Sequence, residues 1–269
     1  MNAMKEIIKH IHIFGLFIKN CLIAQMEYRL NFIIGILTES AFSIAKLLYV
    51  IVIYGAGVDI NGLSPDQVLL FIGTYMLMTA IYTMFFMENF FQLSEHVRSG
   101  SLDMFLTKPV SVQFMATLRR VNFAYPIPNL LVGSAMVLTA KHRMALEVTP
   151  SALALYLLLI ASGTLLMYAL FLLPQLLTFF IVKTQSVIEI SDKLWDFNNM
   201  PMLIYNKWIQ RAGIFLLPIF VITNFPAMAL LERLSGAYAA WGFIVPVLLF
   251  ALTRKAWVFC LKRYSSASS

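Results

Sequence analysis

Charged residues within strongly apolar stretches are the part of this sequence that could do chemistry. Inside a lipid bilayer a charge requires a partner or water, so such residues mark a substrate pathway, an ion relay or a polar contact between helices. Glu39 and Lys46 share one face of a helix but lie about 10 Å apart along its axis. The alternatives to a direct pair are a neighbouring helix, headgroups or a substrate pathway, and we favour a structural contact. The candidate pathway or inter-helix polar residues are Glu39, Lys46, Glu88, Glu189, Asp192 and Asp196.

The charges between residues 189 and 196 form a separate cluster. Glu189 and Lys193 have the four-residue spacing of an ion pair on a helix, and Asp192 and Asp196 have the same spacing with like charges. A patch of this kind fits a water-accessible cavity or a contact between subunits. The sequence leaves both interpretations open.

Motifs of enzymes do not occur in the sequence. It has no Gly-rich loop ending in Gly-Lys-Ser or Gly-Lys-Thr, no His-Glu-x-x-His and no Gly-x-Ser-x-Gly. The four histidines, His10, His12, His96 and His142, are scattered without the spacing of metal ligands. We therefore predict no catalytic residue, no metal site and no cofactor bound by this chain.

Composition places the chain in the membrane. Hydrophobic residues make up 60% of the 269 residues, charged residues only 12%, and the mean hydropathy is +0.80. A water-soluble core cannot absorb this much apolar surface. The net charge of +7 comes from basic residues that mostly flank the apolar runs, where they orient the chain and meet anionic headgroups, so nucleic acid is not the expected partner. Cys21 and Cys260 do not suggest a disulfide framework.

The apolar runs predict an all-α integral membrane fold with six transmembrane helices in a single domain, residues 1–269. The fifth span has two possible positions. Either 212–231 crosses the membrane and 184–205 is a loop, or 178–204 is a polar span and 207–231 is a pair of half-helices that enters the outer leaflet and returns. The predicted spans are 30–54, 68–91, 121–140, 151–182, a fifth within 178–231, and 239–260.

Basic residues set the predicted orientation. The loop before 68 has no Lys or Arg, whereas the 92–120 interval has four, and more follow the last span. By the positive-inside rule this interval and both termini are cytoplasmic, although Lys141 and Arg143 fall on the predicted outer side. The four basic residues of the interval are Arg98, Lys108, Arg119 and Arg120.

The N-terminal segment 4–27 predicts an amphipathic helix lying on the membrane surface. A cytoplasmic helix packed on a soluble partner would show the same amphipathicity. One face carries Ile7, Ile11, Phe14, Ile18 and Leu22, and the other carries Lys5, Lys9, His12 and Lys19.

The 92–114 interval has ordinary soluble character between two membrane-length runs. Gly100 can release a preceding helix, and Lys108-Pro109 stops the short helix that follows. Between them Leu102, Met104, Phe105 and Leu106 offer an apolar surface. We predict a short cytoplasmic helix between spans 2 and 3 on which another protein docks.

The run from Arg98 to Pro109, Arg-Ser-Gly-Ser-Leu-Asp-Met-Phe-Leu-Thr-Lys-Pro, is followed by Phe114. It resembles the arginine-x-glycine-x-leucine-aspartate, leucine, lysine-proline signature of ABC-2 type transporter permeases, and more narrowly the six-span branch encoded separately from its ATPase. The tail from Lys262 to Ala267 and the prolines before the last span, Pro201, Pro218 and Pro226, are similar to that branch's ending and to its re-entrant outer segment.

The resemblance implies a permease subunit of an ATP-driven exporter in a bacterial cytoplasmic membrane. Two permease subunits, identical or homologous, would form the path, and two cytoplasmic ABC ATPase subunits would hold the ATP and Mg²⁺. Leu102, Phe105 and Leu106 would fill an ATPase groove, with charged residues fixing register. The implied ATPase-coupling residues are Arg98, Gly100, Leu102, Asp103, Phe105, Leu106, Lys108 and Pro109. The alternative function is an ion-coupled secondary transporter that uses the intramembrane carboxylates.

Overall fold

The computed structural model describes residues 2–56, 62–181 and 185–264, and within these ranges the chain is built from helices. The first half contains α1 (Asn2–Glu27), α2 (Arg29–Ala56), α3 (Pro65–Phe85), α4 (Met87–Arg98), α5 (Asp103–Leu106), α6 (Val112–Leu118) and α7 (Pro126–Arg143). The second half contains α8 (Pro150–Gln175), η1 (Leu176–Phe179), α9 (Gln185–Asp196), η2 (Phe197–Asn199), η3 (Met202–Ile204), α10 (Lys207–Arg211), η4 (Ala212–Leu216), α11 (Ile219–Leu230) and α12 (Gly236–Lys262).

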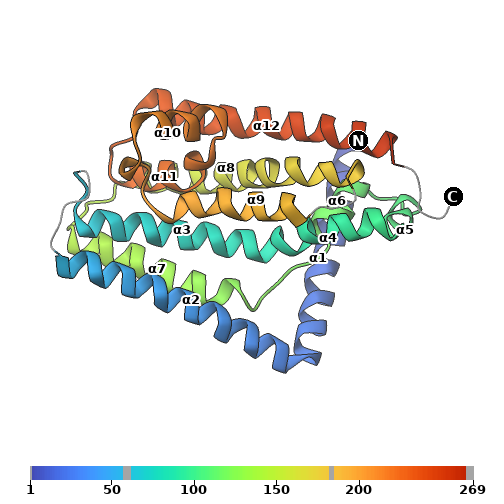
Figure 1. Ribbon diagram of the computed structural model, residues 1–269, viewed down its shortest axis with the longest axis horizontal. Coiled ribbons are helices and arrows are strands. Elements are labelled where there is room, and N and C mark those ends of the chain that lie inside the picture. The colour runs from blue at the N-terminus through green and yellow to red at the C-terminus, as the bar shows by residue number, and fades with distance from the viewer. Residues whose placement is uncertain (1, 57–61, 182–184, 265–269) are drawn as a thin grey trace.

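Helices α2, α3, α7, α8, α9 and α12 run along the long axis of the molecule and form a bundle (Figure 1). Helix α3 lies at its centre, and most of its residues are buried. Its start is encoded locally: Ser64 accepts a hydrogen bond from the Gln67 N–H, the Gln67 side chain accepts one from the Ser64 N–H, and Pro65 occupies the first turn. Five helices of the described residues are long and apolar enough to span a bilayer, or up to six with a bent pair included, so the chain is an integral membrane protein.

The second apolar helix is longer than predicted. Helices α3 and α4 together run from Pro65 to Arg98, which is 34 residues. At 1.5 Å per residue this is about 50 Å, well beyond a hydrocarbon core of roughly 30 Å. The amphipathic α4 therefore extends past the membrane, and the first residues of the 92–114 interval continue this helix.

The third bundle helix begins later than the predicted 121–140. Helix α7 starts at Pro126, with Val121–Tyr125 outside any helix. Pro126 and Pro128 therefore occupy the first turn, where a missing N–H removes no helical hydrogen bond, and they do not interrupt the interior of a span. The fourth apolar helix, α8, reaches Gln175 with Pro174 in its last turn, and the chain continues as a 3₁₀ turn to Phe179.

The region of the predicted fifth span contains the 12-residue helix α9 and a bent pair of helical stretches, and which of them crosses the membrane stays a prediction. Helix α9 runs along the bundle beside the central helices, whereas α10, η4 and α11 gather at one end (Figure 1). The helical stretches Lys207–Leu216 and Ile219–Leu230 are bent by 103° at a break that contains Pro218. By length and composition this bent pair fits either a broken span or a re-entrant loop.

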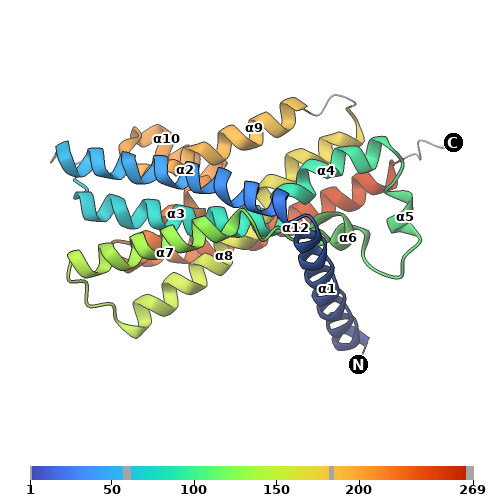
Figure 2. The same ribbon diagram turned by 90° about the horizontal axis from the view of Figure 1, so that it is seen from below.

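Helix α1 lies across the bundle axis at the end that also carries α5 and α6 (Figure 2). Its inner face packs on α6 through His10, Phe14 and Phe17, whose rings contact Phe114 at centroid distances of 4.9, 6.4 and 5.6 Å. Its outer face leaves apolar side chains exposed, among them Ile8, Ile11 and Ile23. Composition alone would allow α1 to span a membrane, but its direction differs from that of the bundle helices.

Candidate functional site

The segment between α4 and α6, residues 99–111, forms a compact knob at the end of the bundle (Figure 1). Helix α4 ends at Arg98, and Gly100 takes a left-handed φ of 73° that turns the chain. The single turn of α5 follows, and Ser111 caps α6 by accepting a hydrogen bond from the Phe114 N–H. We call residues 99–111 the docking segment.

Burial divides the apolar residues of the docking segment into two sets. Leu102 and Phe105 are only 0% and 3% exposed, whereas Met104 and Leu106 are 60% and 48% exposed. The Phe105 ring packs edge-on against His96, 5.1 Å between centroids, and beneath the Arg119 guanidinium at 5.5 Å. The expectation that Leu102 and Phe105 offer a free surface is therefore corrected, because both fill the chain's own core and hold α5 in place.

Charged residues in and directly before the docking segment also contact the rest of the chain. Arg98 forms an exposed ion pair with Glu95 at 2.6 Å. The pKa of Tyr264 lies above its usual value because the side chain is desolvated and the Asp103 carboxylate lies close to it. The end of the described chain thus approaches α5. The rest of the tail that resembles the family, residues 265–267, lies outside the described residues.

His96 is a pH-sensitive element of this packing. Its ring lies 2.9 Å from the Ser101 hydroxyl, and its pKa is lowered by burial and by the nearby Arg120 and Arg119. A lowered pKa means that the folded state favours the neutral imidazole. The contribution of His96 to the free energy of unfolding is therefore complete above the pKa of the unfolded chain, about 6.5, and is lost as the pH falls through the lowered pKa of the folded state.

We expect acidification from pH 7.5 to 5.5 to lower the Tm of the chain more than that of His96→Gln. The difference should be small, on the order of 2 °C, and thermal unfolding in detergent at several pH values measures it. His12→Gln is the matched control, since His12 is exposed on α1. An unchanged pH dependence in His96→Gln would contradict a role for this histidine.

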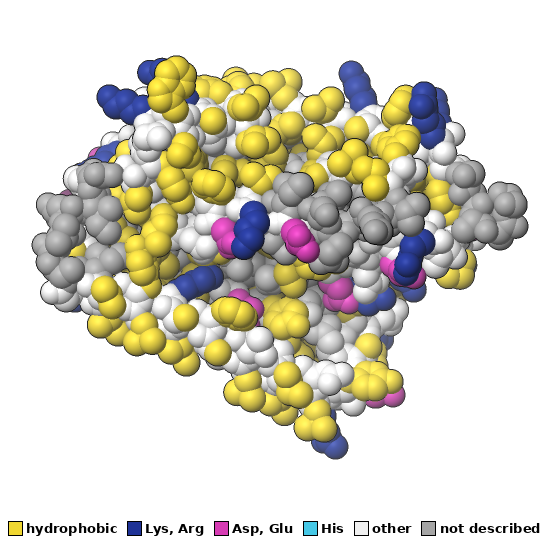
Figure 3. Space-filling model, viewed as in Figure 1, with side chains coloured by type: hydrophobic (Ala, Val, Ile, Leu, Met, Phe, Trp, Pro, Cys, Tyr) yellow, Lys and Arg dark blue, Asp and Glu magenta, His cyan; other side chains and the backbone are white. Residues whose placement is uncertain are grey.

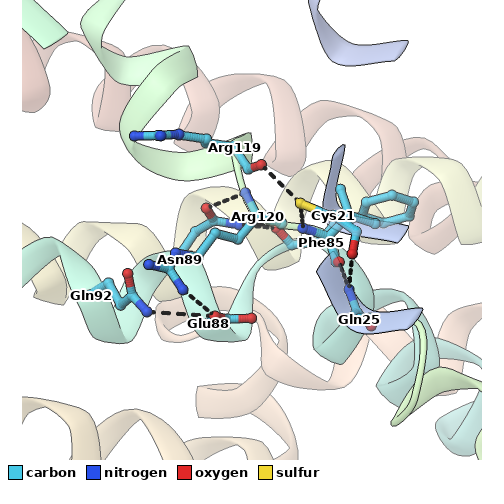
Figure 4. Close-up of polar contacts among 9 residues, drawn as sticks. Cys21, Gln25, Phe85, Glu88, Asn89, Gln92, Arg119 and Arg120 are labelled. Atoms are coloured by element: carbon cyan, nitrogen blue, oxygen red, sulfur yellow. Dashed lines mark hydrogen bonds and ion pairs between the residues drawn. The ribbon is translucent and has the colours of Figure 1, made fainter. Parts of the chain in front are cut away.

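The chain after α6 crosses the bundle end in non-helical form, and its backbone is held by side chains of two other helices (Figure 4). Asn89 of α4 accepts a hydrogen bond from the Arg120 N–H at 2.9 Å and donates to the Arg120 carbonyl at 2.7 Å. Gln25 of α1 donates to the Val121 carbonyl at 2.7 Å and accepts from the Phe123 N–H at 2.9 Å. We call residues 119–123 the junction. Its buried backbone groups are paired although no helix or strand satisfies them.

Two further contacts complete the junction. Glu88, a predicted pathway residue, forms an ion pair with Arg120 at 2.7 Å (Figure 4). The Cys21 Sγ lies 3.5 Å from the Arg119 carbonyl and 3.4 Å from the Val121 N. Cys21 therefore contributes to the contact between α1 and the junction.

Sequence reasoning missed Cys21, Gln25 and Asn89. For Gln25 and Asn89 the only signal in the sequence was an amide side chain within a helix at the edge of an apolar run.

Helix α6 is tied to the bundle by a buried polar cluster. Gln113 donates to the Tyr168 hydroxyl of α8 at 2.9 Å, and the hydroxyl of Thr117 lies 3.0 Å from the same oxygen. The Arg254 guanidinium of α12 donates to the side-chain amide oxygen of Gln113, Oε1, at 2.5 Å. The docking segment is thus anchored at both ends, by α4 before it and by α6 after it.

The remaining charged candidates lie along the bundle. Glu39 accepts a hydrogen bond from Asn129 of α7 at 2.7 Å, and the Lys46 ammonium lies 4.4 Å from the centre of the Tyr75 ring of α3. Each therefore contacts a neighbouring helix. Lys193 approaches Asp196 at 3.8 Å, Glu189 is exposed, and the side chain of Asp192 lies outside the described residues. Figure 3 shows side chains of both charges in the middle of one face, between apolar surfaces.

The helices that are long and apolar enough to span a bilayer make the chain an integral membrane protein, and a family comparison gives its class. The family model for ABC-2 family transporter proteins matches residues 41–268. The chain belongs to this family and is an ABC-2 type permease, a class that in general works with ABC ATPases. No curated protein and no solved structure matches the chain.

Proposed function

We propose that this permease is the transmembrane subunit of an ATP-driven exporter and that its docking segment receives a separate cytoplasmic ATPase. The observation that carries the proposal is the division of that segment into buried anchors and exposed contacts. Leu102 and Phe105 fix α5 to the bundle, while Met104 and Leu106 point outward from a rigid base. An apolar pair on an immobile support is suited to bind a partner and to transmit force.

The junction is the route by which force would reach the membrane. Movement of the docking segment would act on α4 before it and on α6 after it. Asn89 of α4 is hydrogen-bonded to the backbone of Arg120, which follows α6, so the two helices are connected at this point. The junction leads directly into α7, and α4 leads back into α3. ATP-driven closure of the partner would therefore tilt α3 and α7 and exchange inward-open for outward-open states. ATP and Mg²⁺ would be bound by the ATPase.

Helix α1 supports the proposed orientation. Because it lies across the bundle axis, it would run along the membrane surface when the bundle spans the bilayer. Its exposed isoleucines would enter the headgroup and acyl boundary, as in other interfacial helices. The same end carries the basic residues of the 92–120 interval and both described chain ends, so it would face the cytoplasm.

A second permease subunit, identical or homologous, would complete the path. The charged side chains in the middle of the face in Figure 3 would be covered by that subunit or would line water between the two. The competing function is a secondary transporter that uses these carboxylates. Transport that stops on ATP depletion but persists under a collapsed ion gradient would support the exporter, and the reverse would support the competitor.

Leu106→Asp is expected to abolish copurification of an ABC ATPase with the full chain, because a charge replaces an exposed apolar contact. The loss should correspond to at least about tenfold weaker binding. Ala237→Asp carries the same new charge at the opposite end of the bundle and should retain the ATPase. Asp103→Arg should also uncouple ATP hydrolysis from transport. Intact complexes and transport in Leu106→Asp would show that the docking assignment is wrong.

A further inference from the structure

A cavity of about 570 Å³ lies where α1, α6, α8 and α12 meet. Its apolar wall includes Leu118, Leu165 and Phe250, and Ala161 leaves room beside them. Its polar end includes His10, Ser111 and the Arg254 guanidinium. The volume is within the usual range of small-molecule sites. Since the described residues around it include no Asp or Glu, the cavity has a basic end and an apolar end.

The basic end lies at the expected level of lipid headgroups. Arg254 is the first charged residue of α12, and the 18 residues from Gly236 to Thr253 contain none. Eighteen helical residues span about 27 Å, close to the hydrocarbon thickness of a bilayer. The Thr253 hydroxyl donates to the Ala169 carbonyl of α8 at 3.1 Å, so both walls of the cavity reach this level together.

The charge of Arg254 is available to a ligand. It donates to the neutral side-chain amide of Gln113, and within the described part of the chain it forms no ion pair. A guanidinium binds phosphate through paired hydrogen bonds more readily than an ammonium does. Lys255, the next residue, does not line the cavity.

We propose that this cavity binds an anionic phospholipid, with the phosphate on Arg254 and an acyl chain along Leu165 and Phe250. The apolar wall is formed by α8 and α12 at membrane depth, which a soluble partner does not reach, and the basic end selects a negative headgroup. Because Gln113 links Arg254 to α6, the bound lipid would connect the support of the docking segment to α12. The site does not depend on the ATPase partner.

Native mass spectrometry of the full chain in detergent tests this site with added phosphatidylglycerol, phosphatidylcholine or glycerol phosphate. We expect retention of phosphatidylglycerol by the wild type and about tenfold weaker retention by Arg254→Gln, the effect of losing one charge-assisted contact. Ala161→Trp should also weaken retention, because the indole fills the apolar part of the cavity.

Matched controls separate the site from general lipid adhesion. Lys255→Gln removes a neighbouring charge, and Ala154→Trp adds the same indole to an exposed position of α8 away from the cavity, so both should retain the lipid. Equal retention of phosphatidylcholine, or unchanged retention by Arg254→Gln, would overturn the proposal. Binding of glycerol phosphate as strongly as the lipid would also overturn it in favour of a free-anion site.

Discussion

Replacing Asn89 by leucine is expected to release the junction from α4. Asn89 is 3% exposed, and its side chain is bonded to both backbone groups of Arg120. Leucine has a similar volume but leaves a buried N–H and a buried carbonyl without partners. Each unpaired buried group costs about 1–3 kcal/mol, so we expect a total loss of about 2–6 kcal/mol in the free energy of unfolding.

Thermal unfolding measures the total effect of Asn89→Leu, and hydrogen exchange of the peptide that contains the junction locates it. The amides of residues 120 and 123 should exchange at least about tenfold faster. Gln92→Leu, one turn along α4, is the matched control because its amide makes only a 3.5 Å contact with Glu88. Arg120→Gln removes an exposed ion pair and should cost less than about 1 kcal/mol. Equal losses in all three variants would refute a special role for Asn89.

The class and the helical architecture of this protein are predictable from sequence because they depend on quantities that add along the chain. Long apolar runs and few charges require helices that satisfy their own hydrogen bonds in lipid. The Arg98–Pro109 run likewise predicted the family to which the chain belongs. Neither inference needs to know which helix contacts which.

The errors arise where a tertiary contact decides between equivalent local patterns. Leu102, Phe105 and Leu106 are alike in sequence, and only the positions of His96 and Arg119 show which of them are buried. Local pattern reasoning also placed prolines inside a span, although they start α7. The junction could not be foreseen because its backbone is satisfied by side chains distant in sequence, Asn89 about 30 residues away and Gln25 nearly 100 residues away.

The region of the predicted fifth span shows the same limit. Hydropathy measures transfer of a segment into lipid, yet α9 runs along other helices of the bundle and Trp195 packs against Tyr75 and Tyr82 of α3. A polar helix can be accommodated when neighbouring helices, not lipid, cover it. The more apolar 207–231 region bends instead, at a break that contains Pro218.

Substituting Gly133 is expected to destabilise the protein because α3 and α7 approach each other closely there. A Cβ at Gly133 would lie 2.9 Å from the Gly73 carbonyl oxygen and 3.0 Å from the Met76 Cβ, and one at Gly73 would lie 2.9 Å from the Met136 Cβ. These obstructions include backbone, which no rotamer change can remove. Gly133→Leu should force the helices apart at a cost of about 3 kcal/mol or more.

Unfolding of the purified chain in mixed detergent measures this cost, and Gly15→Leu is the matched control because no atom lies within 4 Å of its added Cβ. The double variant Gly73→Ala/Gly133→Leu should be little worse than Gly133→Leu, since helices already separated have room for the second side chain. Strict additivity would mean that the two glycines do not share one contact. The docking segment is connected to α3 through α4 and to α7 through α6 and the junction. Loss of the contact between α3 and α7 should therefore also lower transport coupled to ATP hydrolysis.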